Sequence, residues 1–78
     1  MTQSKTTKEE RLLIAIAKEA DRKPSSPIDV EAIAKSLGFS EKQARKALNL
    51  LARGNFIVKH GGWSVELAPH GLSTVKNL

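Results

Sequence analysis

The stretch IDVEAIAKSLGFSEKQARKALNLLARG, residues 28–54, decides the fold that this sequence predicts. It holds two helical patterns with a short turn between them. In the first pattern, Asp29 has the position of an N-cap, and Gly38 can adopt the left-handed conformation that ends a helix. The apolar residues between these ends recur at helical spacing and are Val30, Ile33, Ala34 and Leu37. A short helix is therefore predicted to end at Gly38.

The second pattern begins at Ser40, which has the spacing of a capping box with Gln43. A helix is predicted over residues 41–53, with Gly54 as its end. At about 100° per residue, its apolar face consists of Ala44, Ala47, Leu48 and Leu51. The turn between the two helices, residues 37–40, is short and contains a glycine. That arrangement is typical of a helix-turn-helix.

The face opposite the apolar one is basic. It carries Lys42, Lys46, Asn49 and Arg53, with Gln43 and Arg45 on its flanks. Between Glu41 and Glu66 the chain contains five basic residues and no acidic one, whereas solvated helices usually intersperse both signs. These side-chain types contact base edges and phosphates. The pattern indicates a nucleic-acid partner, with a merely solubilising face as the alternative.

The segment NFIVKHGGWSVEL, residues 55–67, predicts a β-hairpin. Gly61 and Gly62 can supply the positive φ angles of a two-residue turn between two β-rich runs. Such a turn pairs three sets of residues on one face, namely His60 with Trp63, Val58 with Val65, and Phe56 with Leu67. The other face then holds Lys59, Ser64 and Glu66. Ile57 falls on that polar face too and is a misfit in this register.

The two ends of the chain are expected to differ in order. Residues 1–6 are predicted to be a disordered tail, and Thr7 opens a first helix over about residues 7–20. The apolar stripe of that helix is Leu13, Ile16, Ala17 and Ala20, with Leu12 beside it. Ile14 points away from the stripe and is interpreted either as the edge of the core or as a subunit contact. Residues 69–78 are expected to form a short closing helix or a frayed tail.

Composition limits the classes of function. The 78 residues make one domain, placed at residues 7–78, and the formal charge of +5 suggests a polyanionic partner. The absence of cysteine excludes disulfides and thiolate metal sites, so no metal or other cofactor is expected. Apolar runs are too short for a signal core or a membrane span, which predicts a soluble cytoplasmic protein, nucleoid-associated if the source is prokaryotic. No nucleophile, base and orienter are placed together, so an enzyme is not expected.

Two segments resemble winged helix-turn-helix domains of small MarR-like transcription regulators. VEAIAKSLGFSEKQARKALNLLARGNFIVK, residues 30–59, is similar to that family's helix-turn-helix and first wing strand. VELAPHG, residues 65–71, is similar to the LTPxG motif after the second wing strand, with Ala68 in place of the usual Thr. The resemblance covers residues 7–71. It implies an α+β fold with three helices, a two-stranded hairpin wing at about residues 55–68 and a short closing helix.

The same resemblance implies double-stranded DNA as the partner. Residues 41–53 would be a recognition helix in the major groove, and the wing at residues 59–63 would lie on an adjacent groove or on the backbone. The expected DNA-binding residues are Ser40, Lys42, Gln43, Arg45, Lys46, Asn49, Arg53, Lys59 and His60. His60 is interpreted either as a phosphate contact or as an exposed turn residue. Trp63 is interpreted either as a lid on the core or as a stacking platform.

Two other functions stay open at this point. One is a protein-interaction module of a larger assembly, and the other is an architectural protein that binds DNA without regard to sequence. A homodimer is also expected, since terminal helices form the dimer interface in the regulators that the chain resembles. The apolar residues that would supply this interface are Leu12, Ile14, Leu72, Val75 and Leu78.

Overall fold

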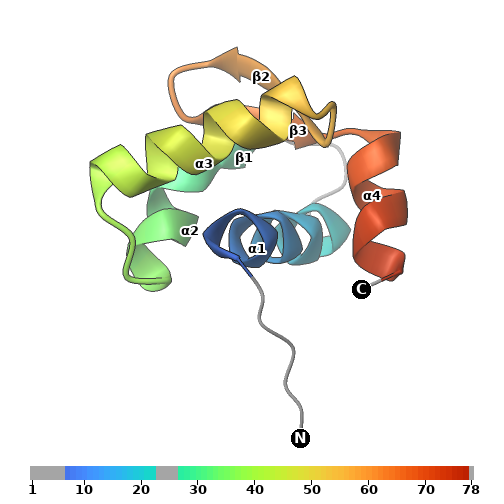
Figure 1. Ribbon diagram of the computed structural model, residues 1–78, viewed down its shortest axis with the longest axis horizontal. Helices are drawn as coiled ribbons and strands as arrows, with labels where there is room; N and C mark the ends of the chain where they lie inside the picture. The colour runs from blue at the N-terminus through green and yellow to red at the C-terminus, as the bar shows by residue number, and fades with distance from the viewer. Residues whose placement is uncertain (1–6, 23–26, 78) are drawn as a thin grey trace, which may run out of the picture.

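The computed structural model describes residues 7–22 and 27–77, and the predicted disordered tail, residues 1–6, lies outside them (Figure 1). The elements in chain order are α1 (Lys8–Arg22), β1 (Ile28–Asp29), α2 (Val30–Ser36), α3 (Glu41–Arg53), β2 (Ile57–Gly61), β3 (Ser64–Leu67) and α4 (Pro69–Lys76). The described residues thus form an α+β fold of four helices and one three-stranded antiparallel sheet. None of these helices is long and apolar enough to cross a membrane.

Three helices begin where the sequence predicts, each because a side chain satisfies free backbone amides at its first turn. Thr7 and Glu10 form a capping box at α1, and Asp29 caps α2. At α3, the Ser40 hydroxyl accepts a hydrogen bond from the Gln43 amide at 3.1 Å, and Gln43 Oε1 accepts one from the Ser40 amide at 2.9 Å. The predicted bounds of α3 are confirmed by these caps.

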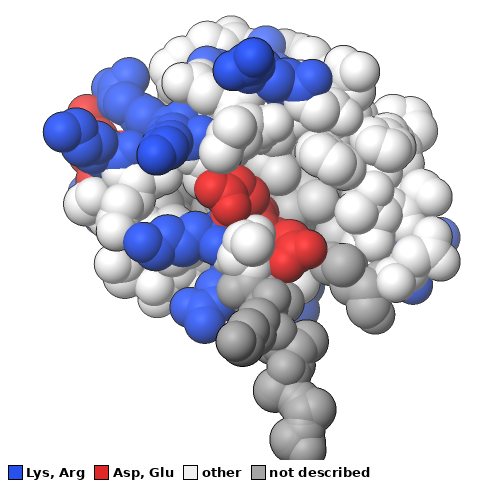
Figure 2. All heavy atoms as spheres, viewed as in Figure 1, with Lys and Arg blue, Asp and Glu red and all other residues white. Residues whose placement is uncertain are grey.

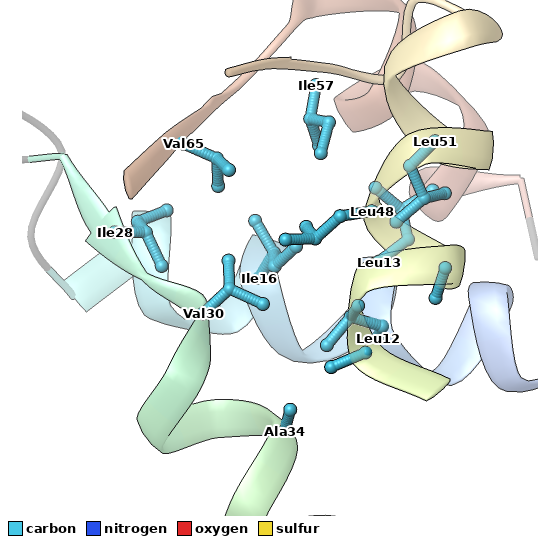
Figure 3. Packing of buried hydrophobic residues seen from close by; sticks show 12 residues of the cluster. Leu12, Leu13, Ile16, Ile28, Val30, Ala34, Leu48, Leu51, Ile57 and Val65 are labelled. Atoms are coloured by element: carbon cyan, nitrogen blue, oxygen red, sulfur yellow. The ribbon is translucent and has the colours of Figure 1, made fainter. Parts of the chain in front are cut away.

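The hydrophobic core lies between α1, α3 and the sheet, with side chains from all three pointing toward one another (Figure 3). The predicted face of α3 is buried as expected, namely Ala44, Ala47, Leu48 and Leu51. On α1 the buried residues are Leu12, Leu13 and Ile16. The α1 core stripe is therefore centred nearer Leu12 than predicted, and Ala17 and Ala20 are only partly buried. Ile14 is also partly buried.

The sheet has three strands in the order β1-β3-β2, so the predicted two-stranded wing is incomplete. The additional strand, β1, has only two residues, and it pairs Ile28 with Val65 and Asp29 with Ser64. Next to this pairing, the amide of Val30 donates a hydrogen bond of 2.9 Å to the carbonyl of Trp63. The start of α2 is thereby held directly against the hairpin.

The predicted hairpin register is wrong by one residue. In the structure Ile57 pairs with Leu67, Val58 with Glu66 and Lys59 with Val65. A bulge between Lys59 and Gly61 shifts the turn to Gly62 and Trp63, while both glycines keep the positive φ angles that the sequence predicts. Because neighbouring strand residues point to opposite faces, Ile57 is buried at 2% exposure and Val58 is 49% exposed. The apparent misfit at Ile57 is a core residue.

The closing segment is a helix, α4, and it packs against α1 (Figure 1). Its first turn sits directly on the backbone of Phe56, whose carbonyl accepts a 3.0 Å hydrogen bond from the amide of Ala68. A Cβ atom at Gly71 would collide with that same carbonyl oxygen. The ring of His70 stacks on the ring of Phe56 with centroids 4.7 Å apart. The glycine therefore permits the close docking of α4.

Candidate nucleic-acid interface

The buried face of α3 fixes which of its cations reach the solvent. Lys42, Lys46 and Arg53 are exposed on the opposite side. None of the three forms an ion pair or a side-chain hydrogen bond with another residue in the described part of the chain. Figure 2 shows Lys and Arg atoms gathered at the upper left and top, over α3 and the hairpin, whereas the Asp and Glu atoms near the centre lie over α1. These three cations are therefore uncompensated.

Arg45 lies on the flank of α3 that faces the hairpin, and it is already partnered. Its Nε and Nη2 each lie 3.1 Å from Oε2 of Glu41, one helical turn earlier. Its guanidinium carbon lies 5.0 Å from the centroid of the Trp63 ring. Both ion-pair partners remain largely exposed, with 63% of the Arg45 side chain and 70% of the Glu41 side chain accessible. Arg45 is thus held in place while still open to a ligand.

Lys59 and Asn49 join the hairpin to the same flank of α3. The ammonium of Lys59 donates a 2.9 Å hydrogen bond to the side-chain oxygen of Asn49. Lys59 follows the buried Ile57 by two residues and so lies on the same side of β2, from which its ammonium reaches α3. The side-chain NH₂ group of Asn49 has no partner among the described residues, while its side-chain oxygen already accepts one hydrogen bond from Lys59.

Two predicted site residues serve first as helix caps. The side chains of Ser40 and Gln43 satisfy each other's backbone amides at the start of α3. Both residues are exposed, and the NH₂ group of Gln43 has no partner among the described residues. Either side chain could contact a ligand with its remaining donor capacity. A full change of rotamer would break the capping hydrogen bonds of α3.

His60 and Trp63 occupy different surfaces of the hairpin tip. His60 Nε2 lies 3.2 Å from Oε1 of Glu66, on the face of the hairpin that also exposes Val58. Trp63 is half-buried and packs against the core, so it covers the core as predicted while also carrying Arg45 on its ring. Val58 does not take part in that cover, because the register places it outside.

The structure brings eight of the nine predicted site residues together on α3, its cap and the adjoining strand, and leaves His60 next to a carboxylate on the outer face. Sequence reasoning missed the supporting roles of Glu41 and Trp63. The four-residue spacing of Glu41 and Arg45 was a usable signal for their ion pair. The contact between Arg45 and Trp63 had no such signal, because it depends on the bulge that shifts the hairpin turn.

A hollow of about 210 Å³ adjoins this face, between α2, the first turn of α3 and Trp63. Its lining includes Glu31, Lys35, Phe39 and Glu41.

Within residues 7–22 and 27–77, no three His, Cys, Asp or Glu side chains gather in a way that could hold a metal ion. Comparisons of the chain with protein-family models, with curated proteins and with solved structures found no match.

Proposed function

We propose that the protein binds double-stranded DNA and regulates transcription, with α3 in the major groove and the β2–β3 hairpin on the adjacent groove or backbone, as in winged helix-turn-helix regulators. The observation that carries the proposal is the exposed face of α3, where Lys42, Lys46 and Arg53 have no acidic partner among the described residues. Duplex DNA supplies closely spaced phosphates, the counter-charges that such a face requires. The function needs no cofactor, and its site of action would be the cytoplasm, on the nucleoid in a prokaryote.

Contacts within the protein suggest which of the basic residues would bind phosphates. The unpaired ammonium groups of Lys42 and Lys46 suit phosphates, which require charge but little directional precision. Lys59 donates a hydrogen bond to Asn49, which holds the hairpin beside α3, where it would meet the DNA backbone. His60 lies next to Glu66 and is the weakest candidate for a phosphate contact, because the carboxylate repels one.

A salt titration tests the proposal. The affinity for random-sequence duplex should fall as salt rises, because binding releases the counterions condensed on DNA. If about four phosphates are neutralised per chain, log K should change with log salt at a slope of roughly −3.6. An affinity that does not respond to salt, or no binding at low salt, would refute binding by this face.

A sequence-indifferent architectural role is the second candidate, and one observation favours it. The side-chain oxygens of Gln43 and Asn49, which a bidentate contact to adenine would use, each already accept one hydrogen bond within the protein, and these bonds orient the two amides. The free side chains on α3 are mainly cations, which bind the backbone of any sequence. Selection from a pool of random duplexes decides between the two functions, since an architectural protein would enrich no motif.

A further inference from the structure

Arg45 differs from the other cations of α3 in how it is held. Glu41 Oε2 accepts a 3.1 Å hydrogen bond from Nε of Arg45 and lies 3.1 Å from its Nη2, and the guanidinium carbon lies 5.0 Å from the centroid of the Trp63 ring. The carboxylate fixes one edge of the planar group and the ring supports its face. A free arginine loses considerable rotamer freedom when it binds, so an arginine fixed in advance binds its ligand with a smaller entropic cost.

The remaining donors of Arg45 form a fork. A guanidinium has five N–H groups, and Glu41 uses those on the edge between Nε and Nη2. The end of the group, where Nη1 and Nη2 each present one N–H side by side, stays free among the described residues. Two parallel donors match the O6 and N7 acceptors of guanine in the major groove, the commonest specific contact of arginine.

The position of Glu41 supports a role in orientation. A carboxylate within a cationic face repels phosphates, so a face built only for backbone binding would be better without it. An acid in the first turn also favours the helix dipole, but that role does not require contact with Arg45. The observed pair of contacts to one guanidinium accounts for the placement of this charge.

On these grounds we infer that Arg45 contacts a guanine base, and that Trp63 and Glu41 are positioning residues that set its direction. The inference rests on the proposed function, because it assumes that α3 enters the major groove of duplex DNA. It makes the hairpin turn a determinant of base preference through Trp63, in addition to any contact of the wing with the backbone.

The test begins with selection of bound sequences from random duplexes by the wild-type protein. The preference is then measured as the ratio of two affinities at one salt concentration, for the selected duplex and for the same duplex with the central G·C pair changed to A·T. We expect this ratio to be about 5- to 150-fold, the range of one good bidentate contact. In Arg45→Lys the charge remains but the fork is lost, so the ratio should approach one while affinity for random duplex is retained.

Two further variants separate positioning from stability. Trp63→Ala should lower the ratio several-fold, and Trp63→Phe, which keeps an aromatic face, should restore most of it. Glu41→Ala should lower the ratio while raising affinity for random duplex, a pair of opposite changes that a purely structural role would not produce. Lys46→Ala is the matched control, because it should lower the affinity of the protein for both duplexes by the same factor and leave the ratio of the two affinities unchanged. Thermal melting of each variant shows that it is folded, and Arg45→Lys and Trp63→Phe test the inference even if Trp63→Ala unfolds.

Several results would overturn the inference. If the wild type binds duplex with no base preference, Arg45 does not contact guanine and the architectural role replaces the proposed regulator. If the preference survives in Arg45→Lys, Arg45 does not contact guanine and the proposed function stands without this inference. If the ratio changes in Arg45→Lys but is the same in Trp63→Ala and Glu41→Ala as in the wild type, the two residues do not position Arg45. If no duplex is bound at low salt, the proposed function and this inference both fail.

Discussion

Lys46 carries its charge in the middle of the exposed face of α3, without an acidic partner among the described residues. We expect Lys46→Ala to weaken binding to every duplex sequence alike and to make the salt slope shallower by about 0.9, the loss of one phosphate contact. The matched control is Lys35→Ala on α2, where the lysine lies 3.8 Å from Glu31. If both variants lose the same affinity, net charge alone governs binding and the face of α3 has no special part.

Ile57 and Val58 are adjacent in sequence and opposite in environment. Ile57→Ala should lower the free energy of unfolding by about 2–5 kcal/mol, because it removes buried methyl groups and leaves a cavity. Val58→Ala should change it by no more than about 0.5 kcal/mol, since Val58 is 49% exposed. Urea unfolding of the two variants measures the difference. If Val58→Ala lowered the free energy of unfolding more than Ile57→Ala, the register predicted from the sequence would be correct instead.

At the scale of elements, α4 depends on one close approach. Gly→Ala inside a helix ordinarily stabilises it by up to about 1 kcal/mol through helix propensity. At Gly71 the added Cβ would collide with the carbonyl oxygen of Phe56, so Gly71→Ala should instead destabilise the protein by about 1–3 kcal/mol. The exposed Ser73 on the same helix provides a control, because Ser73→Ala should be close to neutral. The sign of the Gly71→Ala effect, measured by thermal or urea unfolding, decides whether α4 docks as described.

The elements differ in how far the sequence alone predicts them. The three capped helices are predictable because their caps and apolar spacing are local signals, as at Ser40 and Gln43. The strand β1 is not, because two residues carry no periodicity and become a strand only by pairing with β3. The hairpin register is also beyond local signals, since Gly61 and Gly62 both tolerate positive φ and permit more than one turn. Burial of Ile57 selects between these registers, and that is a tertiary effect.

In the candidate site, too, local features can be predicted from the sequence and tertiary contacts cannot. The basic face of α3 can be predicted from helical spacing, since Lys42, Lys46 and Arg53 lie opposite the buried residues. The contact of Arg45 with Trp63 and that of Asn49 with Lys59 cannot, because each involves a hairpin residue whose position depends on the register. The sequence therefore predicts where positive charge gathers but not which side chains are free.

At the scale of the whole molecule, the expected homodimer remains a prediction. Of the residues expected at its interface, Leu12 is wrong, because it is fully buried in the core, and Leu78 lies outside the described residues. Val75 is partly buried and packs against the core, whereas Leu72 of α4 is 42% exposed. We expect sedimentation equilibrium at tens of micromolar to give twice the chain mass of 8.5 kDa, because a second copy would cover Leu72 and the adjoining surface of α1. Leu72→Glu should then sediment as a monomer, with Ser73→Ala as the control.

The expected dimer also makes a prediction about DNA. The principal extents of one chain are 38 × 26 × 23 Å, and a two-fold dimer on DNA would be expected to place its α3 helices about 34 Å apart, the repeat of successive major grooves. A single species at 8.5 kDa in both the wild type and Leu72→Glu would exclude a dimer in free solution. The expected contact with DNA would then come from one α3 helix and one hairpin of a single chain.

The hydrogen bond between Lys59 and Asn49 has a consequence for how such a protein could change during evolution. Replacing Asn49 by a residue without a side-chain acceptor also releases the ammonium of Lys59, so one substitution changes the helix and the hairpin together. The effect of each position then depends on the residue present at the other, which is epistasis between two elements of the fold. A lineage that acquires a new residue at position 49 should tend to acquire a compensating one at position 59, and the two positions should vary as a pair.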